Sequence, residues 1–220
     1  TFEQAKETTE EDSVSLFLDS PYQMSKIFGE FYGNYYFHQY KMPFVKARFQ
    51  NVYGPGEILG AGQWRGTAHT VWRNVIPTFT FKALHNIGLP VENNGIATRD
   101  FIYVDDIVNG LMLCALNGTA GGVYNLASGM ETSIAELATL INKETGNAAP
   151  LDLKPARNWD RSGKRYGATQ KAKQEIGFEA KITIEDGLRS TIAWTKQNLP
   201  LIKECMRKHQ RYVQEIRDFV

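Results

Sequence analysis

The pattern of apolar and polar positions divides the chain into helices and strands that follow one another. Apolar residues at helical spacing predict helices over 21–41, 71–84, 105–118, 133–146, 183–199 and the segment after Pro200. Short apolar runs bounded by turn residues predict strands over 44–49, 89–94, 98–104 and 121–128. Residues 1–18 and 57–70 read as loops. This alternation favours an α/β fold with a mainly parallel sheet, and such folds bind nucleotides at the carboxyl ends of the strands.

The helix predicted over 21–41 is rich in aromatic side chains. Asp19 or Ser20 is the expected N-cap, Pro21 is the first helical residue, and Met42-Pro43 ends the helix. The aromatic residues are Tyr22, Phe28, Phe31, Tyr32, Tyr35, Tyr36, Phe37 and Tyr40. Because they cover more than one face, we expect the helix to be buried on several sides.

The segment after Pro200 has the pattern of an amphipathic terminal helix. Its apolar positions fall at three- and four-residue steps: Ile202, Met206, His209, Val213, Ile216 and Val220. Either this helix packs on its own domain or it contacts another subunit.

Composition excludes several classes of partner. The 220 residues are 42% hydrophobic and carry a net charge of +1, so nothing favours nucleic acid or an anionic membrane. The longest apolar run, 111–116, is too short to span a bilayer, and the polar N-terminus has no apolar region typical of a secretory signal. Two cysteines, Cys114 and Cys205, build no disulfide framework, which favours a reducing compartment such as the cytoplasm. The histidines, His38, His69, His85 and His209, lack metal-ligand spacing, so we expect no metal.

A tyrosine four residues before a lysine, Tyr22 and Lys26, lies in the first turns of the aromatic helix. Residues at i and i+4 share a helix face. An ammonium beside a phenol favours the phenolate, and this pairing makes a usable general acid or base. The other lysine donors can hold ribose hydroxyls. With ten tyrosines in the chain such a pair also arises by chance, so the spacing alone leaves a purely structural role open.

Four motifs in order give the pair its context. They are SPYQMSK (20–26), RFQNVYGPG (48–56), TRDFIYVDDIVNGL (98–111) and GGVYNLASG (121–129). Together they resemble the extended short-chain dehydrogenase/reductase family, and more closely its NAD-dependent nucleotide-sugar epimerases and dehydratases. The resemblance runs from about Ser20 to about Trp194, and NVYGPGEILGAGQWRGT (51–67) is similar to bacterial enzymes of surface-polysaccharide synthesis.

The family begins with a βαβαβ half that carries a glycine-rich dinucleotide loop, an acidic residue for the adenosine ribose and a catalytic Ser or Thr. None of these is found in this chain. Ser13 and Ser15 lie too close to Tyr22 to be the catalytic Ser or Thr. GEILGAG (56–62) does not follow a strand and enter a helix as the fingerprint requires. The resemblance therefore implies a C-terminal portion of the enzyme, and we expect these 220 residues alone to bind NAD weakly and to be inactive.

The resemblance also implies a domain arrangement. Residues 1–51 and 99–125 would form the remainder of a Rossmann-like NAD-binding domain with a partial, doubly wound parallel sheet. Residues 52–98 and 126–198 would form a smaller α+β substrate-binding domain. Residues 199–220 would add the C-terminal amphipathic helix.

Catalytic and cofactor roles carry over by position. Tyr22 matches the family's acid/base tyrosine, which takes the proton of a sugar hydroxyl as hydride leaves for the nicotinamide. Lys26 matches the lysine that favours the phenolate and grips the nicotinamide ribose. Gln50 occupies a position that lies near the nicotinamide in relatives.

Substrate-side roles carry over in the same way. Asn51 matches an asparagine that contacts the nucleotide-sugar near its diphosphate, or it simply caps a turn. Arg99 matches an arginine that reaches the diphosphate or ribose, or it pairs with Asp100 at the surface. Arg161 matches a later arginine that grips the nucleotide. Asp105 and Asp106 are read more simply as helix caps.

The resemblance implies NAD-dependent epimerisation of a nucleotide-sugar through a transient keto-sugar. A 4,6-dehydratase or a decarboxylase of the same family is the near alternative. A non-catalytic nucleotide-sugar-binding or assembly module is the alternative of another class, and retention of both Tyr22 and Lys26 argues against it. The family commonly dimerises through the helix matching 21–41, so a homodimer is expected in which some of its aromatic side chains pack against the partner subunit.

Overall fold

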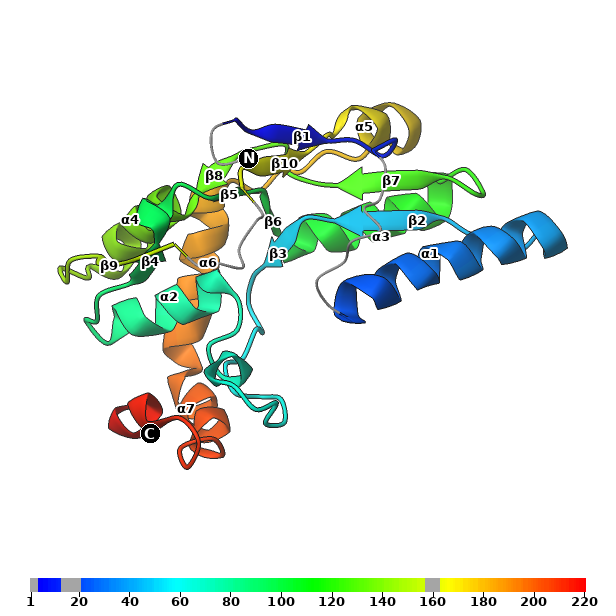
Figure 1. The fold of residues 1–220 in the computed structure, drawn as a ribbon. Helices are drawn as coiled ribbons and strands as arrows, with labels where there is room; N and C mark the ends of the chain where they lie inside the picture. The colour runs from blue at the N-terminus through cyan, green and yellow to red at the C-terminus, as the bar shows by residue number, and fades with distance from the viewer. Residues whose placement is uncertain (1–3, 13–20, 157–162) are drawn as a thin grey trace.

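The computed structural model describes residues 4–12, 21–156 and 163–220 and confirms an α/β fold in which helices alternate with short strands (Figure 1). The α-helices are α1 (Pro21–Tyr40), α2 (Val75–Leu84), α3 (Val104–Asn117), α4 (Ile134–Thr145), α5 (Gln170–Ile176), α6 (Ile184–Gln197) and α7 (Leu199–Arg207). The strands are β1 (Lys6–Thr8), β2 (Lys46–Phe49), β3 (Asn51–Tyr53), β4 (Pro90–Glu92), β5 (Thr98–Arg99), β6 (Phe101–Tyr103), β7 (Val123–Leu126), β8 (Thr132–Ser133), β9 (Asp152–Lys154) and β10 (Arg165–Gly167). Short 3-10 helices are η1 (Ala68–Thr70), η2 (Asn93–Gly95) and η3 (Gln214–Asp218).

Strands β2 and β3 follow one another and form the middle of a parallel arrangement. β2 pairs with β7 from Lys46↔Val123 onward, and β3 pairs with β6 from Asn51↔Phe101 onward. The amide of Gln50, between the two strands, still donates to the Leu126 carbonyl at 3.2 Å. Residues 46–53 therefore lie between β7 and β6, and their carboxyl ends point the same way, as the parallel prediction requires.

Strand β1 corrects the expectation that residues 1–18 are a loop. It pairs in parallel with β10, and the Asn125 side chain of β7 donates to the Thr8 carbonyl at 2.9 Å. Strands of three residues are too short to carry a periodic signal, which is why β1, β9 and β10 were not predicted from the apolar pattern.

Two apolar clusters lie against the strands. One joins α2, α4 and α6 to β3, β4 and β6 around Phe79, Leu137 and Leu188. The other joins α3 and α5 to β6 and β7 around Tyr124, Leu126 and Phe178. Among the described residues, no helix is long and apolar enough to cross a bilayer.

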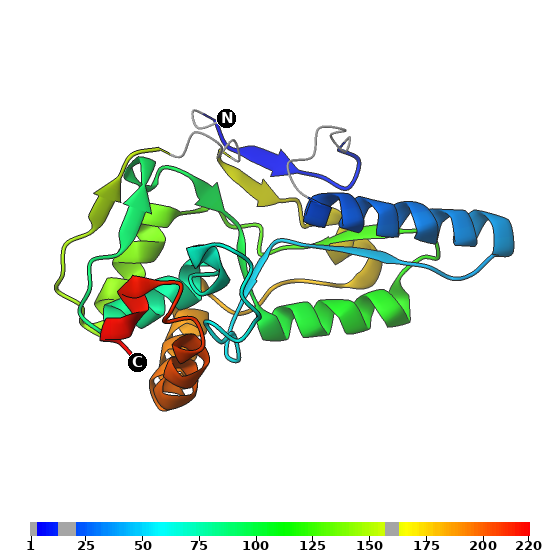
Figure 2. The same cartoon turned by 60° about the horizontal axis from the view of Figure 1, so that its bottom comes forward.

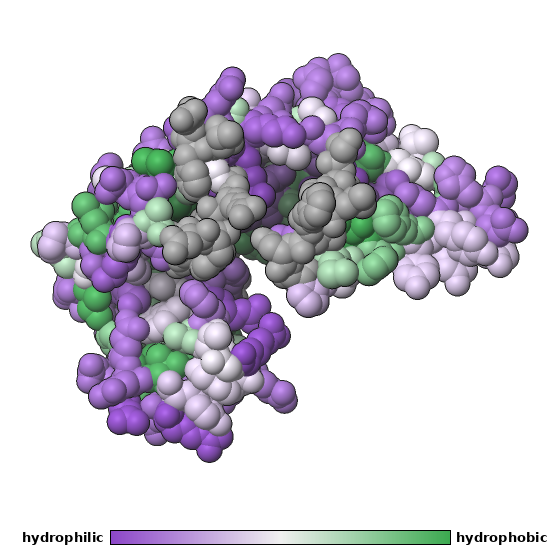
Figure 3. Space-filling view, viewed as in Figure 1, coloured by the Kyte–Doolittle hydropathy of each residue, from purple (hydrophilic) through white to green (hydrophobic). Residues whose placement is uncertain are grey.

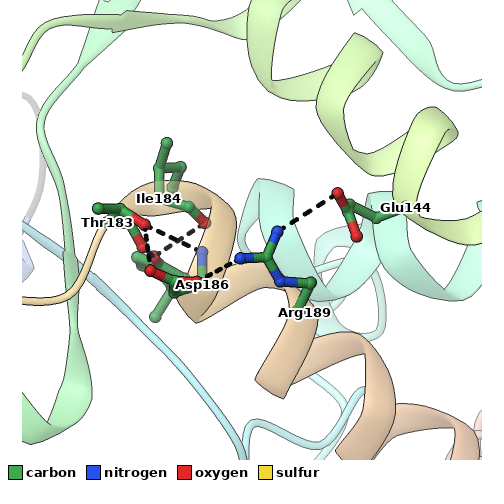
Figure 4. A network of polar contacts seen from close by, with 6 residues as sticks. Glu144, Thr183, Ile184, Asp186 and Arg189 are labelled. Atoms are coloured by element: carbon green, nitrogen blue, oxygen red, sulfur yellow. Dashed lines mark hydrogen bonds and ion pairs between the residues drawn. The ribbon is translucent and has the colours of Figure 1, made fainter.

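Helices α4 and α6 begin with side-chain caps that the sequence encodes locally. Ser133 and Glu136 form a reciprocal capping box at the start of α4, and Gly146 ends that helix with φ of 74°. At the start of α6 the Thr183 hydroxyl accepts from the Asp186 amide at 3.2 Å. Arg189 of α6 contacts both Asp186 and, at 3.7 Å, Glu144 of α4, and so ties the two helices together (Figure 4).

Helix α1 has the predicted bounds but not the predicted burial. It runs along β2 and extends away from α4 and α6 (Figure 2), and Gly33 is its only buried residue within the described chain. The expected N-cap residues, Asp19 and Ser20, lie outside the described residues. The expectation of burial on several sides is wrong for this chain because β2 and the 41–45 connection cover only one edge of the helix.

The predicted helices at 71–84 and after Pro200 are both shorter in the structure. The first begins at Val75 because Asn74 has a φ of 44°, a left-handed conformation that a helix cannot contain. The second, α7, ends at Arg207, and the chain then turns so that His209, Val213 and Ile216 reach loop 57–74 and α2. The C-terminal segment therefore packs on its own chain, the first of the two alternatives.

Candidate functional site

Helix α1 carries the predicted catalytic pair at its first turns. The Lys26 ammonium lies over the Tyr22 ring, 5.0 Å from its centroid, as the i, i+4 spacing predicts. The Ser25 hydroxyl donates to the Tyr22 carbonyl at 2.7 Å and ties down the helix start. Tyr22 is 69% exposed and Lys26 is exposed, so both polar ends are available to a ligand.

Two polar contacts fix the register between α1 and β2. Glu30 accepts two hydrogen bonds from Arg48, at 2.9 and 2.8 Å, and the Asn34 side chain accepts one from Lys46 at 2.7 Å. The helix runs opposite to the strand. Four helical residues rise about 6 Å, which is close to two strand residues at about 3.3 Å each. Counting back along the helix from Glu30, Lys26 is expected at the same height along the strand as Gln50. Tyr22 is expected at the height of Asn51 or Val52.

Gln50 and Asn51 lie where β2 passes into β3. A side-chain carbon placed on Gly167 would come within 2.9 Å of the Gln50 amide nitrogen, so this side chain rests on β10. The Asn51 amide N–H donates to the Asp100 carbonyl at 2.9 Å, and its side chain reaches the same oxygen at 3.3 Å. By the count from Glu30, these two strand residues are expected near the level of the Tyr22–Lys26 pair.

Arg99 lies on β5, with its guanidinium against backbone oxygens. Its Nη1 donates to the carbonyls of Thr98 at 2.6 Å and Gly163 at 3.0 Å. Gly163 directly follows the segment that contains Arg161, which lies outside the described residues. Arg99 and Gly163 are thus neighbours in space.

Asp100 organises the backbone beside these residues. Its side chain is fully buried and accepts hydrogen bonds from the Ser128 amide at 2.9 Å, the Ser128 hydroxyl at 2.7 Å, the Gly129 amide at 2.9 Å and the Gly167 amide at 3.1 Å. The alternative in which Arg99 pairs with Asp100 at the surface is wrong, because that carboxylate is committed inside the fold. The sequence signal for this buried carboxylate is an acidic residue that interrupts the apolar strand TRDFIYV.

Asp106 also differs from its simple interpretation as a helix cap. Helix α3 begins at Val104 with Tyr103 as N-cap, and exposed Asp105 lies in its first turn. The buried Asp106 carboxylate accepts from the amides of Lys181 at 3.1 Å and Ile182 at 3.0 Å. It therefore joins α3 to the segment before α6 rather than capping its own helix.

The outer face of α1 is an apolar surface. Phe28, Phe31, Tyr32 and Tyr35 line an open cavity of about 360 Å³ and are 52%, 58%, 68% and 55% exposed. This agrees with the expectation that these side chains are only partly covered within one chain. We name Phe28, Phe31, Tyr32 and Tyr35 the aromatic face.

Metal ligation and disulfide bonding find no support in the part of the chain that the structure describes. No group of three His, Cys, Asp or Glu residues converges there. Both cysteines are free, and burial raises the pKa of the Cys114 thiol. What the described side chains offer is a Tyr–Lys pair on α1, two amide side chains where β2 passes into β3, and a guanidinium just before β6.

Comparison with known proteins adds the remaining evidence. The model of the NAD dependent epimerase/dehydratase family matches residues 2–127. The human dTDP-D-glucose 4,6-dehydratase is 30% identical over 189 residues, which cover 81% of this chain and 49% of the human protein. The chain therefore spans about half the length of that relative.

Two solved structures share the fold. The Bordetella bronchiseptica enzyme WbmF, in complex with NAD+ and UDP, is 59% identical with a TM-score of 0.83, covering 94% of this chain and 62% of that one. The UDP-glucose 4-epimerase of Thermotoga maritima, solved with UDP-glucose, is 28% identical with a TM-score of 0.73, covering 83% of this chain and 55% of that one.

Proposed function

The chain belongs to the NAD-dependent epimerase/dehydratase family, and we propose that it carries the acid/base and substrate side of an enzyme that epimerises a nucleotide-sugar. The observation that carries this proposal is the Tyr22–Lys26 pair, side by side on α1, a helix that Glu30 and Asn34 fix against β2. The carboxyl ends of parallel strands are where such folds bind nucleotides. The proposal assigns the enzyme to surface-polysaccharide synthesis in the cytoplasm, and the two free cysteines are in keeping with that compartment.

The exposed phenol and ammonium form a donor set that fits the hydroxyls of a nicotinamide ribose. NAD, when bound, supplies the hydride acceptor and donor of the reaction. Tyr22 would be the base that takes the proton of the sugar hydroxyl while the carbon bearing that hydroxyl gives up hydride, which leaves a keto-sugar. Lys26, over the Tyr22 ring on the same helix, would hold ribose hydroxyls of the nucleotide. Tyr22 returns the proton when the carbonyl is reduced again from the other face.

The substrate side rests on the residues next to this pair. Asn51 lies at the start of β3, and Arg99 presents a guanidinium whose fork of donors matches phosphate oxygens. With Arg161, they are assigned to the nucleotide diphosphate and ribose, and Gln50 is assigned to the nicotinamide side. The UDP in the WbmF complex supports a uridine nucleotide as the first ligand to test.

A 4,6-dehydratase is the second candidate, because the human relative of that activity is 30% identical over most of this chain. Both reactions start with the same oxidation and use the same tyrosine. Product analysis separates them, since a dehydratase eliminates water from the keto-sugar and an epimerase does not.

A homodimer through helix 21–41 completes the proposal. The aromatic face offers four half-exposed rings on one helix. Packing these rings against a second copy of α1 would remove their apolar surface from water, which favours a dimer. Phe31→Lys in the intact enzyme should give a monomer by sedimentation. Val108→Lys, at a 52% exposed position on α3, should leave the dimer unchanged.

The catalytic assignment is tested by Tyr22→Phe in the intact enzyme that contains these residues. Turnover should fall by at least about 10²-fold, the usual scale for an acid/base group, with the fold unchanged. Tyr40→Phe, at a 62% exposed tyrosine on the same helix, is the matched control and should keep normal turnover. Near-normal turnover of Tyr22→Phe would contradict the mechanism.

The binding assignment is tested by Arg99→Ala and calorimetry with UDP. A lost charge-assisted hydrogen bond costs about 1.5–3 kcal/mol, so affinity should fall more than the chemical rate does. Unchanged affinity would remove Arg99 from the nucleotide site.

A further inference from the structure

Loop 57–74, between β3 and α2, encloses a second cavity that the proposed function does not use. Its volume is about 200 Å³. The lining residues are Gly62, Gln63, Arg65, Thr67, His69, Thr70 and Arg73. Two arginines, a histidine, two threonines and a glutamine therefore border one space, and no acidic residue is among the lining residues. We name this space the arginine cavity.

The loop around the cavity is folded by its own hydrogen bonds. The Arg65 amide donates to the buried Thr70 hydroxyl at 3.0 Å, and the Thr70 amide donates to the Thr67 carbonyl at 2.9 Å. The turn of η1 continues with the Trp72 amide donating to Ala68 at 3.0 Å. This compact turn sets Arg65 and Arg73 around one cavity.

The C-terminal segment anchors the loop from behind. His209 is 3% exposed, and its Nε2 lies 3.0 Å from the Gly60 carbonyl oxygen and 3.1 Å from that of Gly62. Because both partners are acceptors, Nε2 carries the proton and donates. Trp64 stacks on Tyr212 with ring centroids 4.5 Å apart. Gly60 has a φ of 70°, and a side-chain carbon there would come within 2.9 Å of the Cys205 carbonyl oxygen. The loop is therefore held in place before any ligand arrives.

The charge of the cavity is only partly compensated. Arg65 has no carboxylate within ion-pair distance among the described residues. Arg73 interacts with the Glu57 carboxylate, which also accepts a hydrogen bond from the Asn74 side chain. Fixed positive charge around a preformed cavity is suited to an oxyanion, because guanidinium forks bind carboxylate and phosphate oxygens in pairs.

The cavity also has a suitable position. Loop 57–74 follows the carboxyl end of β3, on the edge of the hollow that Figure 3 shows between the part of the molecule that carries α1 and the part that carries α7. Resting on the proposed function, we infer that the arginine cavity binds an oxyanion of the nucleotide-sugar, a carboxylate or a phosphoryl group, through Arg65 and Arg73. This anion site is additional to the one assigned to Arg99.

The experiment is an NMR titration of the 220-residue chain. The probes are inorganic phosphate, UDP, UDP-glucose and UDP-glucuronate, and the reporters are the amide signals of Gly62, Gly66 and Thr70. The wild type is compared with Arg65→Gln/Arg73→Gln, which removes both charges at exposed positions. Arg189→Gln, an exposed arginine on α6, is the matched control for lost charge. Unchanged amide signals elsewhere show that each variant is folded.

We expect the loop signals to shift with at least one probe and its affinity to fall about tenfold or more in Arg65→Gln/Arg73→Gln, but not in Arg189→Gln. Equal loss for UDP, UDP-glucose and UDP-glucuronate identifies a phosphoryl group. Extra affinity for UDP-glucuronate, lost only with the two arginines, identifies a sugar carboxylate. Equal titrations of wild type and double variant with every probe would overturn the inference.

Failure of the inference differs from failure of the proposed function. If UDP binds and responds to Arg99→Ala but not to the double substitution, the arginine cavity is not an anion site and the proposed function stands. If phosphate binding depends on Arg65 and Arg73 in a protein that binds no nucleotide, the cavity is supported and the proposed function is contradicted.

Discussion

Helices α1 and α4 are held in opposite ways. α4 has twelve residues, a reciprocal capping box and three fully buried side chains in the apolar cluster with α2 and α6. α1 has twenty residues, one buried position and a short set of polar contacts to β2. The helix proposed to carry the chemistry is therefore the less secured of the two within this chain. Its register depends on a few side chains that can be changed singly.

The largest loss of stability should come from changing Asp100, which holds the segment that leads into α4. Asp100 is buried and holds the amides of Ser128, Gly129 and Gly167, which precede α4 or form β10. Asp100→Ala leaves these donors without a partner, and we expect a loss of roughly 3–5 kcal/mol in the free energy of unfolding, the scale for removing one partner of a buried charged network. Urea unfolding measures it. Asp105→Ala, at an exposed carboxylate five residues away, should cost less than about 1 kcal/mol.

The bounds of α1 and α4 were the most predictable feature, because their signals are local. Ser133, Glu136 and Gly146 define α4 in the sequence, and Pro21 with Met42-Pro43 defines α1. Burial was less predictable. The aromatic content of α1 suggested burial on several sides, but burial depends on which surface covers a helix, and β2 covers one edge.

The residues of the candidate site also differ in how far the sequence predicted their contacts. Tyr22 and Lys26 could be paired from spacing alone, since i and i+4 share a helix face. Asp100 and Asp106 were misread, because acidic residues are usually exposed and their partners here, Ser128 and Lys181, are distant in sequence. Sequence periodicity carries no information about such long-range pairing with backbone amides.

The edge on which α1 packs can be tested with two glycines of the same helix. A methyl group on Gly33 would lie 1.9 Å from the Phe44 ring, whereas one on Gly29 meets no atom within 4 Å. Gly33→Ala should therefore cost about 1–3 kcal/mol through overpacking, reduced by the gain in helix propensity. Gly29→Ala should stabilise α1 by up to about 1 kcal/mol. Hydrogen exchange of α1 amides measures both, and equal shifts in the two variants would show that α1 does not pack on Phe44.

The register contact between Glu30 and Arg48 should have a smaller effect. The two hydrogen bonds raise the pKa of Arg48, and both side chains are 28% exposed. Glu30→Gln should cost about 0.5–1.5 kcal/mol, seen as faster hydrogen exchange in α1 and not in α4. Glu204→Gln, which breaks an exposed pair with Arg207 on α7, is the control and should change little. Faster exchange in α4 as well would mean that the two helices are not independent.

The smallest effect concerns the capping box of α4 and its pH dependence. Hydrogen bonds from the Ser133 amide and hydroxyl lower the pKa of Glu136. A carboxyl group whose pKa is lower in the folded state stabilises that state above its unfolded pKa, near 4.3, and loses this contribution as pH falls through the folded value. Glu136→Gln keeps an acceptor but removes the charge, so it should cost up to about 1 kcal/mol at pH 7 and progressively less toward pH 3. Urea unfolding of both proteins across this range gives the difference, and Glu131→Gln, at an exposed position just before the helix, should show none. A Glu136→Gln cost that stays constant with pH would show that the charge contributes nothing to holding α4 and that its stability comes from Leu137, Ala138 and Ile141 instead.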